Sequence, residues 1–317
     1  MKRVLVTGAT GFVGSALAAR LSQADGFAPV AVTRRPFAFP DGVEAVQVRD
    51  LSELGPKLRG IDTVVHCAAR VHVMREEAAN PLAAFRKDNV ETPLRLAEDA
   101  ARAGVRRFVF LSSVKANGEE TFDAPLTELT QPRPETPYGQ SKLEAEDGLR
   151  AIAGRTSLEI VSLRPPLVYA GHAGGNFARL LRWLCRGLPL PLGSVDNKRS
   201  YIALDNLVDV LVRAIDHPKA ANEVFLVSDG DDLSTPEMLR AIVEGMDKEA
   251  ALLPFPVPLI RLAATMLGQR DAARQVCGSL AIDSRKVRET LSWQPPLGAR
   301  DALRAAGAAF AARQVSG

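Results

Sequence analysis

Short apolar runs alternate with longer segments of helical periodicity along the first two-thirds of the chain. The short runs are rich in valine and aromatic residues, as strands are, while the longer segments repeat apolar residues every three or four positions. Strands that alternate with helices predict a parallel sheet covered by helices on both faces. We expect strands at residues 4–6, 30–33, 45–48, 63–66, 108–111 and 159–163, and helices at 12–22, 51–58, 81–103 and 138–153.

The pattern changes after Arg164-Pro165-Pro166. We expect a loop at 171–175, an amphipathic helix at 176–186, a proline-spaced strand or lip at 188–193, a helix at 203–216, a strand at 223–227 and a helix-rich tail from 235. The predicted fold is therefore α/β, with a doubly wound parallel sheet and a smaller carboxy-terminal substrate-binding lobe. The sheet domain is predicted to take residues 1–165, with 200–230 returning to it, and the lobe 166–199 and 231–317.

Composition and charge exclude several classes of protein. The chain of 317 residues is 46% apolar, and its 40 basic and 37 acidic side chains leave a net charge of +3, which is too balanced for nucleic-acid binding through charge alone. The three cysteines, Cys67, Cys185 and Cys277, show no metal-ligand spacing. We therefore expect no metal site and a reducing compartment, the cytoplasm.

The most apolar stretch, residues 252–267, contains three prolines and Arg261. A membrane span needs about 20 apolar residues with few charges, so no span is predicted. The expected structure is a mobile loop around 254–258 followed by a partly buried helix. Contact with a membrane surface stays open as an alternative.

A glycine triad directly follows the first predicted strand, in Thr7-Gly8-Ala9-Thr10-Gly11-Phe12-Val13-Gly14. The first glycine permits a tight turn, the second a close approach to a pyrophosphate, and the third close packing of helix on strand. Amide groups at the helix start then bind phosphate. The predicted dinucleotide contacts are Gly8, Gly11, Phe12, Val13 and Gly14; a plain strand–turn–helix without ligand is the alternative.

The end of the second predicted strand carries Arg34 and Arg35, where a carboxylate usually reads the ribose 2′-hydroxyl of NAD. Two guanidiniums suit a 2′-phosphate instead. The sequence thus favours NADP over NAD. Alternatively, both arginines are solvated surface charges.

Tyr138 and Lys142 are four residues apart on a predicted helix and therefore share a face. A nearby ammonium lowers the pKa of a phenol, which then exchanges a proton near neutral pH. Ser113 follows a predicted strand, where its hydroxyl faces the ligand crevice of such a sheet. We predict Ser113, Tyr138 and Lys142 as catalytic residues. The alternatives are a surface Tyr–Lys pair and, for Ser112 and Ser113, a helix cap or turn.

Taken together, the glycine triad, Ser113, Tyr138 and Lys142 resemble the short-chain dehydrogenase/reductase superfamily, and the lobe after residue 165 resembles its extended branch. The resemblance spans the chain and implies a Rossmann-type sheet. It also implies a homodimer formed through the helices at 81–103 and 138–153, with burial of both helices within one chain as the alternative. Further cofactor contacts implied in this way are Asp50, Leu51, Cys67, Ala68, Ala69, Asn89, Pro165 and the ribose-binding Lys142.

The extended branch mostly handles nucleotide-activated sugars. Asn176 and Arg199 resemble its diphosphate contacts, and Leu190 its segment along the nucleobase. An arginine beside a helix amino terminus is also a physically sensible diphosphate clamp. We therefore expect a UDP-hexose-type substrate; the clamp argues against steroid-like ketones.

Three sugar chemistries of the branch compete. A 4,6-dehydratase is ranked last because Val114-Lys115 follows Ser113 where such enzymes carry an acidic pair. Arg34 and Arg35 suit an exchanging NADPH, which favours a UDP-4-keto-sugar 4-reductase by a small margin over a UDP-hexose 4-epimerase. A non-catalytic NADP-binding sensor is a further alternative, although such proteins often lose the tyrosine or the lysine.

Overall fold

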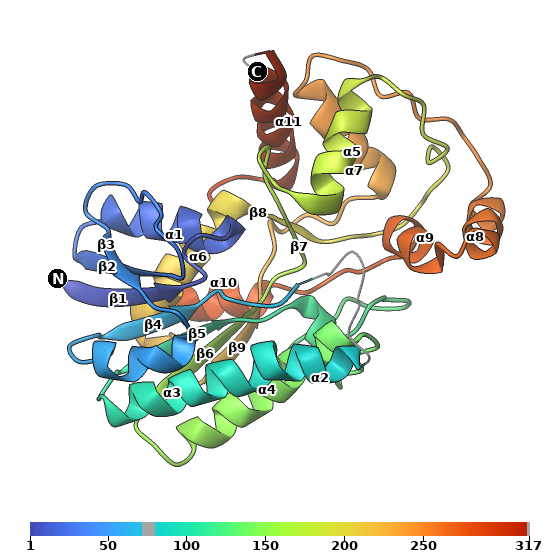
Figure 1. Ribbon diagram of the computed structural model, residues 1–317. Coiled ribbons are helices and arrows are strands. Elements are labelled where there is room, and N and C mark those ends of the chain that lie inside the picture. The colour runs from blue at the N-terminus through green and yellow to red at the C-terminus, as the bar shows by residue number, and fades with distance from the viewer. Residues whose placement is uncertain (72–79, 316–317) are drawn as a thin grey trace.

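A parallel sheet forms the centre of the computed structural model, which describes residues 1–71 and 80–315 (Figure 1). Within these residues the sheet has seven strands in the order β3-β2-β1-β4-β5-β6-β9, and the order reverses beside β1. The carboxyl ends of β1, β4 and β5 therefore meet at one edge, where such sheets bind ligands. The strands are β1 (Lys2–Thr7), β2 (Phe27–Thr33), β3 (Glu44–Gln47), β4 (Thr63–His66), β5 (Arg107–Leu111), β6 (Glu159–Arg164) and β9 (Glu223–Leu226).

Alternate residues of each strand point to opposite faces of the sheet, and both faces are buried. On β1, Val4 and Val6 pack with Leu17 of the first helix, whereas Leu5 packs with the helices of the other face. This two-sided burial explains why the strands read as nearly continuous apolar runs. One face is covered by α1 (Phe12–Ser22) and α6 (Leu204–Asp216), and the other by η1 (Leu51–Lys57), α3 (Thr92–Arg102) and α4 (Pro137–Ala153).

A smaller lobe stands beyond the carboxyl edge of the sheet (Figure 1). Its core joins α5 (Gly175–Cys185), α7 (Thr235–Glu244) and α11 (Ala299–Val315), and the short strands β7 (Leu167–Tyr169) and β8 (Tyr201–Ala203) connect it to the sheet. The lobe also carries α8 (Val257–Met266) and α9 (Arg270–Cys277), while α10 (Arg285–Leu291) packs near β9. We call these parts the sheet domain and the C-terminal lobe. The exact division of the chain remains a prediction, which the return of β9 to the sheet supports.

The predicted α/β architecture is confirmed, and three local expectations need correction. Residues 51–57 form a 3-10 helix, because Pro56 lacks the amide hydrogen that a regular helix needs. The helix expected at 81–103 is interrupted: α2 (Pro81–Arg86) passes through a π-turn, η2 (Lys87–Glu91), into α3. The proline-spaced strand or lip expected at 188–193 has no regular strand and forms a single bridge between Leu190 and Leu252.

The apolar stretch at 252–267 agrees with the prediction. The partly buried helix expected there is present as α8, in which Val257, Ile260 and Ala264 are half-buried and no residue is fully buried. In the described part of the chain, no helix is long and apolar enough to cross a membrane.

Candidate active site

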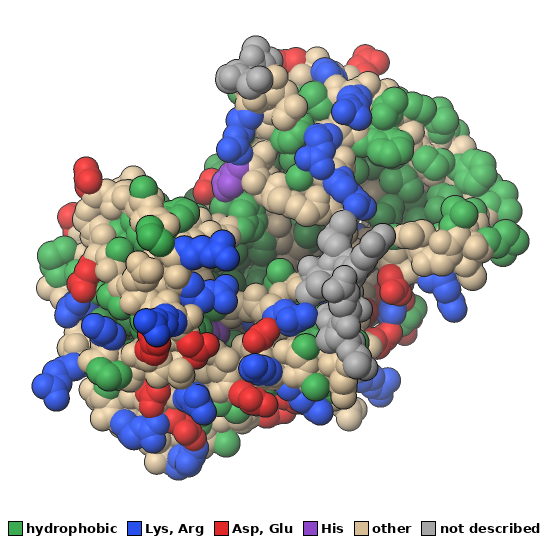
Figure 2. Space-filling view, viewed as in Figure 1, with side chains coloured by type: hydrophobic (Ala, Val, Ile, Leu, Met, Phe, Trp, Pro, Cys, Tyr) green, Lys and Arg blue, Asp and Glu red, His purple; other side chains and the backbone are tan. Residues whose placement is uncertain are grey.

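A cleft of about 840 Å³ gathers residues from both parts of the molecule. Ser113 and Tyr138 line it from the sheet domain, and Asn176, Leu190 and Arg199 line it from the C-terminal lobe. Figure 2 shows the molecule hollowed between these two parts. The cleft thus unites Ser113 and Tyr138 with all three predicted substrate contacts, while Lys142, the third predicted catalytic residue, is not among its lining residues.

Tyr138 lies in the first turn of α4, with Pro137 as the first helical residue and Thr136 as the capping residue. The cap places the half-buried phenol beside Ser113 at the end of β5. Burial disfavours the phenolate and raises the pKa of Tyr138 to about 12, while a side-chain hydrogen bond with Ser113 acts to lower it. The expected lowering of this pKa by Lys142 is therefore not what the structure shows: burial has the largest effect, and Ser113 is the group that opposes it.

Ser113 has two roles in this geometry. Its Oγ accepts a hydrogen bond from the amide of Lys115 at 3.2 Å and so caps a short 3-10 turn, η3 (Val114–Ala116). It also lines the cleft beside Tyr138. The capping interpretation and the catalytic interpretation of this serine are thus compatible.

Lys142 is almost completely buried, with 1% of its surface exposed. Its ammonium donates a hydrogen bond to the carbonyl of Leu111 at 2.9 Å and lies 4.5 Å from the centre of the Phe110 ring and 5.9 Å from that of Tyr138. Burial lowers the pKa of Lys142 from 10.5 to about 8, although Cys67 and Glu146 act in the opposite direction. Since a buried ammonium is costly, its retention beside Tyr138 points to chemistry rather than to stability.

A buried ion pair lies one turn further along α4. Glu146 contacts Arg164 at 2.6 Å, and both side chains are shielded from solvent. Arg164 also donates to Asn117 at 2.8 Å, and Ser112 donates to Glu146. This network links α4 to the ends of β5 and β6, and thereby fixes the helix that carries Tyr138 against the edge carrying Ser113.

The glycine loop has the geometry expected of a phosphate cradle. Gly8 adopts a φ of +67°, and a Cβ there would lie 2.7 Å from the amide nitrogen of Ala68. A Cβ on Gly14 would lie 2.2 Å from the carbonyl oxygen of Gly8. Gly11 precedes α1 without a side-chain cap, so the amides of Phe12 and Val13 remain at the helix start. These residues fit a dinucleotide pyrophosphate.

The turn after β4 lies beside this cradle. It contains Cys67, Ala68 and Ala69, and its close approach to Gly8 brings the two turns together. Burial raises the pKa of the Cys67 thiol to about 12, so this cysteine stays protonated. It therefore lies where a cofactor would bind without itself being a nucleophile.

Asn89 lies in the π-turn and is 1% exposed. Its side-chain oxygen accepts from the amide of Arg70 at 2.8 Å, and its nitrogen donates to the Arg70 carbonyl and to Ser141 Oγ, both at 3.0 Å. The amide is thus fully engaged with protein groups. In this structure Asn89 positions the turn after β4 against the catalytic helix, and direct cofactor contact stays a prediction.

The remaining predicted cofactor residues surround the sheet edge. Arg34 and Arg35 follow β2 and are exposed. Asp50 caps η1 by accepting from the Ser52 amide at 2.9 Å, which lowers its pKa, and Leu51 packs partly on the core. Pro165 is buried, and its carbonyl accepts from the amide of Val114 at 2.9 Å.

Arg199 stands at the lobe side of the cleft. It is half-buried, and one of its guanidinium nitrogens donates to the carbonyl of Gly278 at 2.8 Å. Burial lowers the pKa of this guanidinium, with Tyr201 and Glu120 acting against the shift. Asn176 is exposed in the first turn of α5, on the same cleft. A cation and a helix start that face one cavity can hold a diphosphate.

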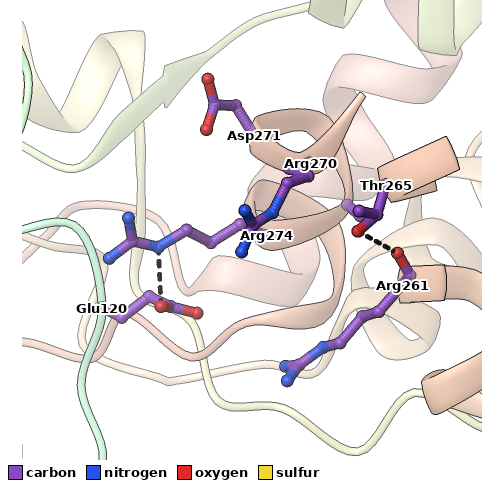
Figure 3. A pocket seen from close by; sticks show the side chains of 7 residues that line it. Glu120, Arg261, Thr265, Arg270, Asp271 and Arg274 are labelled. Carbon is purple, nitrogen blue, oxygen red and sulfur yellow. Dashed lines mark hydrogen bonds and ion pairs between the residues drawn. The ribbon is translucent and has the colours of Figure 1, made fainter. Parts of the chain in front are cut away.

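A second cavity, of about 390 Å³, lies between α8, α9 and Glu120. Figure 3 shows Arg274 reaching Glu120, with Arg261 and Arg270 nearby. The two atoms of the Arg274–Glu120 pair are 2.6 Å apart, and Arg274 also pairs with Glu135. None of the predicted catalytic residues lines this cavity, so the first cleft is the candidate active site.

Comparison with known proteins decides the family. The model of the NAD dependent epimerase/dehydratase family matches residues 4–228. The chain belongs to this family. The UDP-glucose 4-epimerase of Vibrio cholerae is 40% identical over 313 residues, which are 98% of this chain and 95% of that protein. The family resemblance inferred from sequence is therefore confirmed, and with it a nicotinamide-dependent enzyme of nucleotide sugars.

Two further proteins are similar along nearly their whole lengths. The GDP-6-deoxy-D-mannose reductase of Pseudomonas aeruginosa is 25% identical over 314 residues, or 96% of this chain and 95% of that protein. The structure of MoeE5 in complex with UDP-glucuronic acid and NAD is 27% identical, with a TM-score of 0.76 and 99% of each chain covered. The chain is thus similar over nearly its whole length both to a UDP-glucose 4-epimerase and to a GDP-6-deoxy-D-mannose reductase.

Several cleft residues of this epimerase/dehydratase family member were not predicted from the sequence. Tyr201 and Thr235 lie near Arg199, and Trp183 contributes a partly exposed indole from α5. Trp183 lies in the amphipathic helix predicted for 176–186, and this could have indicated it as a cleft residue. Tyr201 lies two residues after Arg199, in a segment that resembles the Arg-x-Tyr-Ile pattern of the extended branch, and this could have indicated it. Thr235 is brought to the cleft by folding of the lobe, and no local pattern marks it.

Proposed function

We propose that this protein is a UDP-hexose 4-epimerase. The observation that carries the proposal is the 40% identity to a UDP-glucose 4-epimerase across 98% of the chain. The cleft supports it, because Ser113 and Tyr138 face Asn176 and Arg199 across one cavity. This replaces the small preference for a 4-keto-reductase, which rested on Arg34 and Arg35.

The proton chemistry belongs to Tyr138 and Ser113. Both would hydrogen-bond the C4 oxygen of the sugar, and Tyr138 would accept the hydroxyl proton during oxidation and return it during reduction. A bound dinucleotide supplies hydride acceptance and return, and its oxidised form adds a positive charge that favours the phenolate. Lys142 would hold the ribose while remaining largely protonated at neutral pH, since its pKa is about 8.

The lobe would hold the nucleoside diphosphate. Arg199 keeps guanidinium donors beyond the one bound to Gly278, and the α5 amino terminus with Asn176 adds polar groups to the same cavity. Leu190 and Leu192 offer an apolar wall for the base. After oxidation, a 4-ketone held mainly by its diphosphate could turn its other face to the cofactor, as epimerisation requires.

The choice between NADP and NAD rests on Arg34 and Arg35. Both side chains are exposed, and no ion pair to a carboxylate engages them in the described residues. This agrees with the prediction of NADP, whereas the complex of the similar MoeE5 contains NAD. Identifying the nucleotide released from denatured enzyme tests the prediction, and loss of any NADP preference in an Arg34→Ala/Arg35→Ala variant would trace it to these residues.

The deciding experiment supplies UDP-glucose or UDP-galactose without added cofactor. Interconversion of the two with no net change in nicotinamide absorbance supports the epimerase. Oxidation of added NADPH by a UDP-4-keto-sugar, without interconversion, would favour the reductase that Arg34 and Arg35 suggest. Nucleotide binding without turnover in either assay would favour a sensor.

We also infer a cytoplasmic enzyme, because its three cysteines are free thiols. A homodimer through α3 and α4 stays a prediction. Neither helix carries a large, strongly exposed hydrophobic side chain, and a Cβ at Gly148 would meet Leu94, so the two helices pack closely on each other. Light scattering of the purified protein measures the number of chains per particle.

A further inference from the structure

Helix α8 turns an apolar face to solvent. Leu259, Leu262 and Met266 are 49%, 51% and 77% exposed, and Ala263 is exposed beside them. Their spacing of three and four residues places them on one stripe. A helix normally directs such a stripe into the core.

The opposite face of α8 makes the contacts with the lobe. Val257, Ile260 and Ala264 are half-buried and also follow helical spacing. Both faces of the helix are therefore apolar, and the lobe covers only one of them. Arg261 and Thr265 lie between the two faces and line the second cavity (Figure 3).

Neighbouring segments extend this apolar surface. Backbone hydrogen bonds of 2.9 and 2.8 Å tie Leu190 to Ala251 and Leu253, so residues 188–193 lie beside the segment that leads into α8. Figure 2 shows hydrophobic side chains gathered over this end of the lobe. We define the α8 surface by its large exposed members, Trp183, Leu188, Leu253, Phe255, Leu259, Leu262, Met266 and Leu267.

In the two chain segments that contribute the α8 surface, residues 171–195 and 250–270, all charged side chains are positive. Residues 171–195 contain three arginines and residues 250–270 contain two, and neither segment contains a carboxylate. All five, Arg179, Arg182, Arg186, Arg261 and Arg270, are exposed, and none forms an ion pair within the described chain. Glu249 and Asp271 stand just outside the second segment.

Several arginines elsewhere on the surface are paired, whereas others, such as Arg34 and Arg35, are exposed and form no ion pair in the described residues. Arg155 contacts Glu98 at 2.6 Å, and Arg304 contacts Glu244 at 2.8 Å. The α8 surface is thus marked by large exposed apolar side chains that lie in two segments whose charged residues are all arginines. A partner that fits it must be apolar and anionic together.

We propose that the C-terminal lobe docks on an anionic phospholipid surface through the α8 surface. The leucines, Met266 and Phe255 would enter the acyl boundary, and the arginines would meet lipid phosphates. Trp183 suits the interface between the two, where indoles concentrate in membrane proteins. Because Trp183 also lines the active-site cleft, docking would bring the mouth of that cleft to the lipid surface.

Charge favours a lipid surface over a second copy of this chain. Two copies joined through the α8 surface would bring ten arginines together without a carboxylate from either segment. Like charges across an interface oppose association. An anionic bilayer satisfies the same arginines.

The test is co-sedimentation of the full-length enzyme with vesicles. Binding is expected with phosphatidylcholine and phosphatidylglycerol in equal parts, and little with phosphatidylcholine alone. A Leu262→Glu/Met266→Glu variant should lower the bound fraction by about tenfold or more, because each change removes an inserted side chain and adds a repelled charge. An Arg182→Gln/Arg186→Gln variant should lose most of the preference for anionic vesicles.

The matched control is Leu129→Glu, which places the same charge on a leucine that is 96% exposed outside the α8 surface. This variant should bind vesicles like the wild type. Interconversion of soluble UDP-hexoses should be unchanged in all variants, so failure of docking and failure of the proposed activity are separable. Absence of wild-type binding to anionic vesicles overturns the proposal. So does a wild-type oligomer that Leu262→Glu/Met266→Glu dissociates, because the surface is then an interface between copies.

Discussion

Helices α4 and α8 depart from the usual distribution of side chains in opposite ways. Helix α4 buries Lys142 and Glu146, whereas α8 leaves Leu259, Leu262 and Met266 exposed. Both arrangements are costly, since charges lose hydration when buried and apolar groups order water when exposed.

The difference lies in compensation. In α4 the chain supplies partners: Arg164 for Glu146, and the Leu111 carbonyl and Phe110 ring for Lys142. The described residues supply nothing comparable for the outer face of α8. The buried charges of α4 have partners within the chain and help to position the catalytic residues. The exposed apolar side chains of α8 have no such partner in the described residues, which indicates a binding partner outside the chain.

The largest expected effect removes the reacting group of α4. Tyr138→Phe keeps the ring and deletes the hydroxyl, so turnover of UDP-hexose should fall by about 100-fold to 10,000-fold, the range typical of lost proton transfer. Dinucleotide binding, measured by fluorescence titration, should persist. The control is Tyr169→Phe, which removes a buried hydrogen bond to Asp229 away from the cleft and should retain turnover. Unchanged turnover in Tyr138→Phe would end the catalytic assignment.

The second prediction concerns the buried ion pair between Glu146 of α4 and Arg164. Arg164→Leu leaves the Glu146 carboxylate buried without its cation and should lower the free energy of unfolding by about 3–5 kcal/mol in urea titrations. Arg155→Leu breaks the exposed pair with Glu98 and should cost at most about 1 kcal/mol. Equal losses in the two variants would contradict the role assigned to the buried pair.

The third prediction follows from the pKa of Lys142, which burial lowers from 10.5 to about 8. Between these pH values the unfolded chain holds a proton at this residue that the folded chain has released. The free energy of unfolding should therefore rise with pH across this window, by about 3 kcal/mol in total from this residue. Lys142→Met has no titrating group at this position. In chemical denaturation from pH 7 to pH 10, the free energy of unfolding of the wild type should therefore increase relative to that of the variant. Parallel curves would refute the shift.

The smallest expected effect concerns α8. Leu262→Gln changes an exposed side chain and should alter the free energy of unfolding by less than about 0.5 kcal/mol. Leu149→Ala, at a fully buried position of α4, should cost about 2–5 kcal/mol. Thermal unfolding of both variants measures the contrast. A large loss for Leu262→Gln would show that α8 is covered within the chain after all.

Local pattern was enough to predict much of this molecule. The alternation of apolar runs and helical segments identified the strands of the parallel sheet, because strands buried on both faces need continuous apolar residues. The glycine triad was readable because Gly8 and Gly14 occupy positions where a side chain would collide with backbone. Tyr138 and Lys142 were readable because helical spacing places them on one face.

Features made by distant residues escaped prediction. The pair of Glu146 and Arg164 joins a helix to a strand, and nothing near either residue in the sequence marks the other. The π-turn at Asn89 arises from contacts with Arg70 and Ser141, which are 19 and 52 residues away. The exposure of α8 depends on how much of the helix the rest of the lobe covers. This could not be predicted locally, because an apolar sequence by itself predicts burial.

The hydrogen bonds of the Asn89 side chain connect two parts of the proposed active site. One amide holds the turn beneath the proposed cofactor site with its oxygen and nitrogen, and the same nitrogen holds the helix that carries Tyr138. Hydride and proton must leave or reach the sugar within one geometry, and misplacement by about 1 Å can slow an enzyme by about 100-fold. Because one side chain is hydrogen-bonded to both segments, the position of the turn below the proposed cofactor site depends on the position of the helix that carries Tyr138.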